Sequence, residues 1–362
     1  MLDLLVDDAQ RKRRVTLKDI AALAGVGTAT VERALNNRGN VRPETCRKIL
    51  NVARELNYFP SLPIGHHGVI RLDVLLVRPE TLFYSRINSA FERLAASLGK
   101  DVVIHRSFVK EADIAGFVEK ITHPPYQRSA LILACPAYPA ILSALRDVAD
   151  SGLPVVQLVT RNLPDLPYVG IDNHAAGRTA ALCMKRSLVH GNGREEDGER
   201  TGGHRRRRGS VIALCHSMAY ANHRERIEGF SGFLAEQTDD RLFLRDVLFD
   251  RDDPDEAARL VHQAIVSDPD LVGIYTAGGD SLHIGTVLKK HAARALCWIG
   301  HEVNDVTRRC LADGTMTLAI DQTPEHQAGI ALTLCLQKLG IIPALVEAEP
   351  PKFRLVTPEN LD

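Results

Sequence analysis

The chain has 362 residues and carries 45 Lys and Arg residues against 45 Asp and Glu residues, so its formal net charge is zero. It is 45% hydrophobic and 25% charged, the profile of a water-soluble globular protein with room for two or three domains. No apolar run reaches the length of a membrane span, and the acidic start Met1–Asp8 lacks the charge pattern of a secretory leader. We therefore expect a cytoplasmic protein with no membrane partner.

The seven cysteines occur singly along the chain, mostly inside apolar runs. An odd number of widely spaced cysteines argues against a disulfide framework and against a zinc site. We therefore expect neither a bound metal nor disulfides.

The first predicted elements are three short helices between residues 16 and 56. Thr16 has the position of a helix N-cap, and Asp19 completes a capping box with it. Apolar residues then recur at helical spacing, and Gly25 fits the left-handed position that ends a helix. A second helix follows directly, and a third begins at Pro43. Three helices with one shared apolar face form a small core and leave one helix free to enter the major groove of DNA.

The charge of this region supports the same interpretation. Between Arg11 and Ser61 there are 11 Lys and Arg residues against four Asp and Glu residues, an excess of seven positive charges. Because the whole chain is neutral, the excess is local, and a basic patch attracts phosphate by releasing counter-ions. An ordinary three-helix bundle with a solvated basic face is the alternative that spacing and charge alone leave open.

A specific pattern of residues decides between these alternatives. It consists of Val15–Ala21, Ala24–Val26, Thr30–Val31, Arg33, Leu35–Asn36, Glu55–Tyr58 and Pro60. This pattern resembles the DNA-binding headpiece of the lactose/galactose repressor (LacI) family over its whole length and without gaps. The resemblance implies that the second helix reads base edges with Thr28, Ala29 and Arg33, and that Thr16, Thr30 and Asn36 hold phosphates. The Arg33 guanidinium can bond guanine O6 and N7 together.

Two features depart from the pattern of that family. Glu32 replaces the usual serine on the second helix, where its carboxylate would repel phosphate or accept a hydrogen bond from a cytosine amino group. The family normally continues with a hinge helix that wedges into the minor groove, but here Pro63, Gly65 and Gly68 disfavour a helix. We therefore divide the chain into a headpiece over residues 1–60, an atypical linker over 61–71 and a core over 72–362.

From Leu72 onward, short apolar runs alternate with amphipathic segments of helix length. The predicted strands are Leu72–Val77, Val102–His105, Ala130–Ala134, Val155–Val159, Val211–Leu214, Val272–Tyr275, Leu296–Ile299 and Leu318–Ile320. The helical segments between them include Ile87–Leu98, Ala137–Ala149, Arg224–Glu236 and Glu256–Val266. This alternation predicts parallel sheets covered on both faces, and so many strands favour two sheets rather than one. Such sheets bind ligands beyond the carboxyl ends of their strands.

Four motifs in this part of the chain occur in a specific order. They are Gly170–Asn173, Arg224–Phe230, Gly300–Glu302 and Asp321–Pro324. Their order resembles the effector-binding core of the same repressor family, which is similar in fold to periplasmic sugar-binding proteins of type I. The resemblance implies an all-α helix-turn-helix headpiece joined to an α/β core of two Rossmann-like parallel-sheet subdomains. It also implies that the chain returns to the first subdomain after the Gln-x-Pro element and crosses between the subdomains three times.

The same resemblance implies a ligand site built around Arg226, whose guanidinium can bond two hydroxyls or a carboxylate in a fixed geometry. The other candidate ligand contacts are Arg78, Phe83, Tyr84, Arg161, Asp280, Glu302 and Gln322. Thr160 and Gly279 replace an acid and an amide that are common in the family, so we expect a shift of the pocket towards positive charge. The expected effector is a sugar, a polyol, or a sugar acid or phosphate. For Arg78 and Arg161, each taken alone, a surface or hinge salt bridge is an equally good interpretation.

Residues 190–209 are polar and glycine-rich, which predicts a flexible loop before the Val211 strand. The run Arg205–Arg208 inside it is better explained by solvation than by phosphate binding.

Together these features predict a ligand-responsive transcriptional regulator and not an enzyme. It would bind near-palindromic operator DNA as a homodimer, acting as a repressor that a small sugar-like metabolite releases or tightens. The alternatives are a solute-binding protein or a sugar-modifying enzyme without a DNA function. The sequence has no phosphate-binding glycine motif and no nucleophile elbow, and His301–Glu302 lacks the second histidine of a zinc motif. We therefore expect no catalytic residues, no cofactor and no metal.

Overall fold

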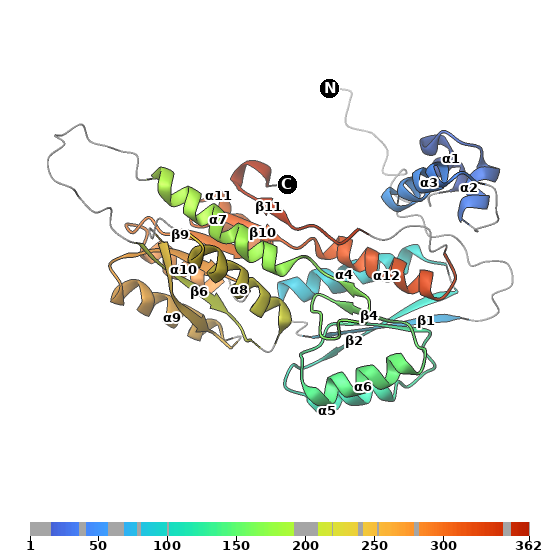
Figure 1. Cartoon of the computed structure of the whole chain (residues 1–362), viewed down its shortest axis with the longest axis horizontal. Helices are drawn as coiled ribbons and strands as arrows, with labels where there is room; N and C mark the ends of the chain where they lie inside the picture. The colour runs from blue at the N-terminus through green and yellow to red at the C-terminus, as the bar shows by residue number, and fades with distance from the viewer. Residues whose placement is uncertain are drawn as a thin grey trace, which may run out of the picture.

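The computed structural model of the chain describes residues 16–35, 41–56, 69–77, 81–99, 101–191, 209–218, 220–237, 242–251, 253–278, 282–342 and 349–361. Within these ranges the chain forms a helical N-terminal unit and an α/β core with two sheets (Figure 1). The fold class expected from the sequence is therefore confirmed.

The N-terminal unit consists of α1 (Leu17–Ala24), α2 (Thr28–Leu35) and α3 (Pro43–Glu55). Thr16 and Asp19 form the predicted capping box at the start of α1, and Gly25 ends that helix in the left-handed conformation with φ 64°. The three helices share one small apolar core. Its most buried members are Ile20, Ala24, Val31, Ala34 and Ile49.

The first subdomain contains a five-stranded parallel sheet in the order β2-β1-β3-β4-β5. Its strands are β1 (Ile70–Val77), β2 (Val102–Val109), β3 (Ala130–Leu133), β4 (Val155–Leu158) and β5 (Tyr168–Val169). Its helices are α4 (Leu82–Ser97), α5 (Ile114–Thr122), α6 (Pro139–Asp150) and α12 (Pro324–Lys338). Figure 1 shows α5 and α6 on one face of the sheet and α4 and α12 on the other. Because both faces are covered, the central strands β1 and β3 are almost continuously buried.

The second subdomain contains a six-stranded sheet in the order β11-β10-β9-β8-β6-β7, in which only β11 runs antiparallel to its neighbour. The strands are β6 (Gly209–Cys215), β7 (Leu242–Phe249), β8 (Leu271–Thr276), β9 (Cys297–His301), β10 (Leu318–Asp321) and β11 (Arg354–Val356). The helices are α7 (Asn173–Gly191), α8 (Ala221–Ala235), α9 (Pro254–Ser267), α10 (Leu282–Lys290), α11 (Asp305–Ala312) and a 3-10 turn, η2 (Pro358–Asn360).

Side chains of β6 divide the second subdomain into two apolar layers. Val211, Ala213 and Cys215 pack with α7 and α8, whereas Ile212 and Leu214 pack with α9, α10 and α11. This alternation follows from the two-residue period of a strand. The alternation therefore decides which helices cover each face of the sheet. Ligand sites in such sheets lie at the carboxyl ends of the strands, beside these helices.

The chain crosses between the subdomains three times, as the resemblance implied. It leaves the first sheet after β5 to form α7, returns after β10 to form α12, and ends beside β10 as β11. Helix α12 packs against α4 and against β3, β4 and β5, so it belongs to the first subdomain. Several parallel crossings at one place make a hinge that permits the two halves to move as rigid bodies.

Some boundaries differ from the sequence prediction. All eight predicted strands are present, but β1 begins at Ile70, so the last two residues of the predicted linker belong to the core. Three strands were missed because β5 and β11 are very short and β7 is a half-buried edge strand with Arg245–Asp246 in its middle. Helix α7 runs to Gly191 and β6 begins at Gly209, which trims the predicted loop at both ends. The expected hinge segment 61–68 and the run Arg205–Arg208 lie outside the described residues.

In the described part of the chain, no helix combines the length and the apolar character required to cross a bilayer.

Candidate functional site

Helix α2 presents a polar face that is free of core contacts. Val31, Ala34 and Leu35 are buried against α1 and α3, so the opposite side of the helix faces outward. Thr28, Ala29 and Arg33 are exposed there, and Thr30 is half-buried. These are four of the six side chains expected to contact DNA.

Two hydrogen bonds hold Arg33 along this face. Its Nε donates to the Ala29 carbonyl oxygen at 3.2 Å and its Nη2 to Thr30 Oγ1 at 3.5 Å. Both are long, exposed bonds, which a base edge can replace at small cost. Thr16, by contrast, uses its hydroxyl in the α1 cap, donating to Asp19 Oδ2 at 2.6 Å. Asn36 lies outside the described residues.

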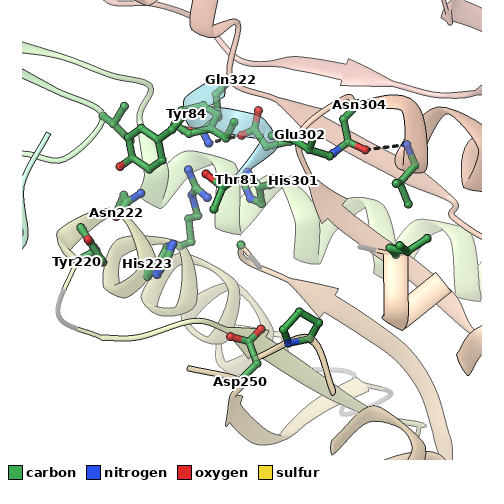
Figure 2. A pocket seen from close by; sticks show the side chains of 18 of the residues that line it. Thr81, Tyr84, Tyr220, Asn222, His223, Asp250, His301, Glu302, Asn304 and Gln322 are labelled. Carbon is green, nitrogen blue, oxygen red and sulfur yellow. Dashed lines mark hydrogen bonds between the residues drawn. The ribbon is translucent and has the colours of Figure 1, made fainter. Parts of the chain in front are cut away.

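A cavity of about 430 Å³ lies between the two subdomains, lined from both sides. Residues 81–84 and Val159 come from the first subdomain, and the ends of β6, β7, β8, β9 and β10 with the segments that follow them supply the rest of the wall. Figure 2 shows Tyr84, Gln322 and Glu302 along one side of this cavity, with Tyr220, Asn222 and His223 opposite them. The volume falls in the range of small-molecule sites.

Arg226 is held at the wall of this cavity by close packing of two helices. Gly177 of α7 and Gly229 of α8 each lie so close to the facing backbone that a Cβ would overlap a carbonyl oxygen. This approach brings Arg226 of α8 to Asn173, the first residue of α7, and Arg226 Nε donates to Asn173 Oδ1 at 2.9 Å. Arg226 Nη1 donates to the Ala277 carbonyl oxygen at 2.7 Å. The guanidinium is 1% exposed, and its Nη2 has no hydrogen-bond partner among the described residues.

Glu302 stands on a strained stretch of backbone at the end of β9. Its φ of 71° lies in the left-handed region, as does the φ of 68° at Val159, another residue of the cavity wall. Non-glycine residues in that conformation cost about 1–3 kcal/mol and cluster at functional sites. Burial and the neighbouring Asp321 raise the pKa of Glu302 to about 8. The carboxyl accepts a hydrogen bond from Gln322 Nε2.

His301 adds a neutral imidazole to the same wall. Burial lowers its pKa well below the usual range, and the positive Arg226 and the nearby His223 lower it further. His301 Nε2 lies 2.9 Å from the Tyr275 hydroxyl, and its Nδ1 has no partner among the described side chains and backbone groups. If the hydroxyl donates to Nε2, the imidazole proton resides on Nδ1 and becomes a free donor.

The structure brings together five of the eight expected ligand contacts. Phe83, Tyr84, Arg226, Glu302 and Gln322 all line the cavity. Arg78 and Asp280 are outside the described residues.

Arg161 does not line the cavity. The left-handed Val159 turns the chain after β4, so Val159 faces the cavity while the exposed Arg161 donates to the Pro164 carbonyl oxygen at 2.6 Å. The described wall holds Arg226 together with the carboxyl groups of Asp250, Asp253 and Glu302. Because Arg78 is outside the described residues, the expected shift towards positive charge stays a prediction.

Sequence reasoning missed several polar residues of this wall. They are Thr81, Tyr220, Asn222, His223, Asp250, Asp253, His301 and Asn304. A usable signal existed for some of them, because His301 and Asn304 lie at the end of a predicted strand, where ligand contacts gather. Asp250 follows β7, which was not predicted, so its position could not be found in this way. No group of three or more His, Cys, Asp or Glu side chains in the described ranges is arranged to hold a metal ion.

Comparison with known families agrees with both parts of the chain. Residues 16–61 match "Bacterial regulatory proteins, lacI family", and residues 74–340 match "Periplasmic binding protein domain". The chain belongs to the lacI family of bacterial regulatory proteins. The lacI match covers all three helices of the headpiece, and the core match begins inside β1 and ends just after α12.

Among its relatives is the HTH-type transcriptional regulator DegA of Bacillus subtilis, 27% identical over 184 residues, which are 49% of this chain and 54% of DegA. Another is the HTH-type transcriptional repressor CytR of Escherichia coli, 29% identical over 174 residues, which are 46% of this chain and 49% of CytR. The matches thus span about half the length of these two relatives. A carbohydrate transporter solute-binding protein of Agrobacterium radiobacter, solved with D-arabinose, has the same core fold at 15% identity and a TM-score of 0.69, with 82% of this chain and 96% of that chain covered.

Proposed function

We propose that this protein is a transcriptional regulator, acting as a repressor, whose DNA affinity is set by a small polyhydroxylated ligand in the cleft. One observation carries the proposal: a lacI-type headpiece with an outward-facing α2 is joined to a core with a polar cavity between two hinged sheets. A solute-binding protein or a sugar-modifying enzyme uses a cavity of this kind but has no use for the headpiece. DegA and CytR, which share this family, are named as transcriptional regulators.

Two headpieces of a homodimer would occupy successive major grooves of an operator. The operator would be near-palindromic, because the two-fold symmetry of the protein requires the same symmetry in the DNA. Thr28, Ala29 and Arg33 on the outer face of α2 would contact base edges, and Arg33 has the chemistry to bond guanine O6 and N7. Thr16, Thr30 and Asn36 would contact phosphates, which position the helix without reading sequence. This role places the protein in the cytoplasm, where the DNA is.

The ligand would act by changing how the two subdomains sit against each other. Arg86 of α4, in the first subdomain, donates to Asp321 Oδ1 at 2.6 Å and to the Val303 carbonyl oxygen at 3.0 Å, both in the second subdomain. Its Nη1 is also 3.7 Å from Glu302 Oε2, at the cavity wall. A ligand that contacts Glu302 therefore acts on the group that joins the subdomains. Its differential affinity for the open and closed arrangements sets the response, whether release or tightening.

The cavity wall fits a sugar, a polyol or a sugar acid. Phe83 and Tyr84 provide an apolar face on which the C–H side of a pyranose or furanose packs, and Asn222 and Gln322 offer amide groups for hydroxyls. The solved relative with bound D-arabinose carries a ligand of this chemistry. No catalytic role is proposed for any of these residues.

The proposal is tested with DNA fragments that the purified protein selects from a random double-stranded library. Fluorescence anisotropy then measures the affinity for the selected fragment, alone and with sugars, polyols and sugar acids added singly. We expect tight binding to a near-palindrome and a change in affinity with one class of ligand. Failure to select any sequence would overturn the proposal. Turnover of the ligand without DNA would favour the enzyme alternative.

A further inference from the structure

The cavity wall contains a buried positive charge that forms no ion pair with a described carboxylate. Arg226 is 1% exposed, its Nε and Nη1 bond an amide oxygen and a carbonyl oxygen, and its Nη2 has no partner among the described residues. No described carboxylate lies within 4.0 Å of this guanidinium. Buried charges in proteins are normally paired, because an isolated ion in a region of low dielectric is costly.

The acidic side chains of the same wall are held by other groups. Asp253 caps α9 by accepting from the backbone N–H groups of Asp255 and Glu256. Asp250 Oδ1 lies 3.9 Å from His216 Nδ1. Glu302 is bonded by Gln322 and lies close to Arg86. None of the three forms an ion pair with Arg226, so their presence does not remove its need for an anion.

The protonation state of Glu302 also leaves the charge of Arg226 uncompensated. Burial and Asp321 hold its pKa at about 8, in spite of the nearby Arg226 and Arg86. At pH 7 the carboxyl is therefore mostly neutral and does not compensate the guanidinium.

We propose that the ligand of this cleft carries a single carboxylate, which binds Arg226 Nη2, and that the ligand is a hydroxylated monocarboxylic acid of sugar size. This inference rests on the proposed function in taking the cavity as the effector site. A carboxylate is favoured over a phosphate because only one guanidinium nitrogen is free, whereas a phosphate dianion requires several donors. His301 Nδ1, buried in the same wall, supplies a second donor when the Tyr275 hydroxyl donates to Nε2.

The remaining polar groups of the cavity agree with a hydroxylated body rather than a plain fatty or aromatic acid. Asn222 Oδ1 is buried in the wall and has no partner among the described residues, so it accepts from a ligand hydroxyl. Gln322 and Asn304 line the opposite part of the cavity (Figure 2). One carboxylate with several hydroxyls would pair with Arg226 Nη2, His301 Nδ1 and Asn222 Oδ1.

Matched pairs of ligands test this inference on the full chain. Isothermal titration calorimetry at pH 7 compares D-galacturonate with D-galactose, D-glucuronate with D-glucose and D-gluconate with D-sorbitol, with D-glucose 6-phosphate as the phosphate arm. We expect one acid to bind roughly tenfold or more tightly than its neutral partner, because a hydrogen bond to a charged group contributes about 1.5–3 kcal/mol. R226M should abolish this preference, and R178M, which removes a half-buried arginine of α7 that pairs with Glu236, should keep it. Circular dichroism confirms that both variants are folded.

Each other outcome overturns the inference. These outcomes are tighter binding of a neutral partner, a preference for the phosphate, a preference that survives R226M, and no binding by any of the acids. The proposed function fails separately: if an acid binds with the expected preference but never changes DNA affinity, the regulator is refuted and the carboxylate site stands. If a neutral sugar changes DNA affinity, the regulator stands and the carboxylate site is refuted.

Discussion

Replacing Glu302 with glutamine should make the protein's stability less dependent on pH. In the folded state, burial and Asp321 favour the protonated carboxyl, while Gln322, Arg226 and Arg86 oppose this effect without cancelling it. The unfolded chain releases the proton near its ordinary pKa of 4.5, whereas the folded chain retains it up to a pKa of about 8. Stability therefore falls as the pH rises through this window, because the folded state binds the proton that the unfolded state has lost.

The size of the effect follows from the two pKa values. One pKa unit corresponds to about 1.4 kcal/mol, so the step from 4.5 to about 8 amounts to roughly 5 kcal/mol. Between pH 5.5 and pH 7.5, the part of the window that is easily measured, wild type should lose roughly 2–3 kcal/mol relative to E302Q. Glutamine has nearly the same size and does not titrate, so the difference between the two curves isolates this one carboxyl.

The assay uses the chain's single tryptophan. Trp298 is fully buried in β9, four residues before Glu302, so its emission reports unfolding of the second subdomain. Urea unfolding of wild type and E302Q is compared at pH 5.5, 6.5, 7.5 and 8.5, with E228Q, at an exposed position of α8, as the control. Stability curves of wild type and E302Q that run parallel over this range would refute the argument that burial holds Glu302 protonated.

Three further changes test other parts of the structure. Gly177→Ala should destabilise the core by about 1–3 kcal/mol, because the added Cβ overlaps the backbone of the facing helix. Gly232→Ala is the control: its Cβ would have no atom within 4 Å, so it should stabilise the core by roughly 0.4–1 kcal/mol. Thermal unfolding measures the stability of both variants. Arg33→Ala should cost about 1–3 kcal/mol of specific DNA binding and leave ligand affinity unchanged, as anisotropy and calorimetry measure. Arg86→Met removes the bonds that join the subdomains and should weaken core stability by about 2 kcal/mol or more; an unchanged urea midpoint would remove Arg86 from this role.

Local signals in the sequence were sufficient for most of the secondary structure. The capping box at Thr16, the left-handed Gly25 and the apolar runs of the core each depend on neighbours within a few residues, so they can be read directly. Strand β7 shows the limit of this reasoning. Its eight residues lie at the edge of the sheet and are half-buried, so burial does not impose the continuous apolar pattern that revealed the other strands.

The sequence alone determined that the chain carries a DNA-binding headpiece and a two-sheet core, because helix caps, apolar periodicity and specific motifs are local properties. It also pointed to Arg226 and Glu302. Only the tertiary structure decided that Arg161 turns away from the cavity while His301 and Asn222 enter it. The contacts between these side chains, and the net charge of the site that they form, depend on how distant strand ends approach each other across the cleft. The unpaired charge of Arg226 arises from that approach, so it cannot be predicted from any local segment of the sequence.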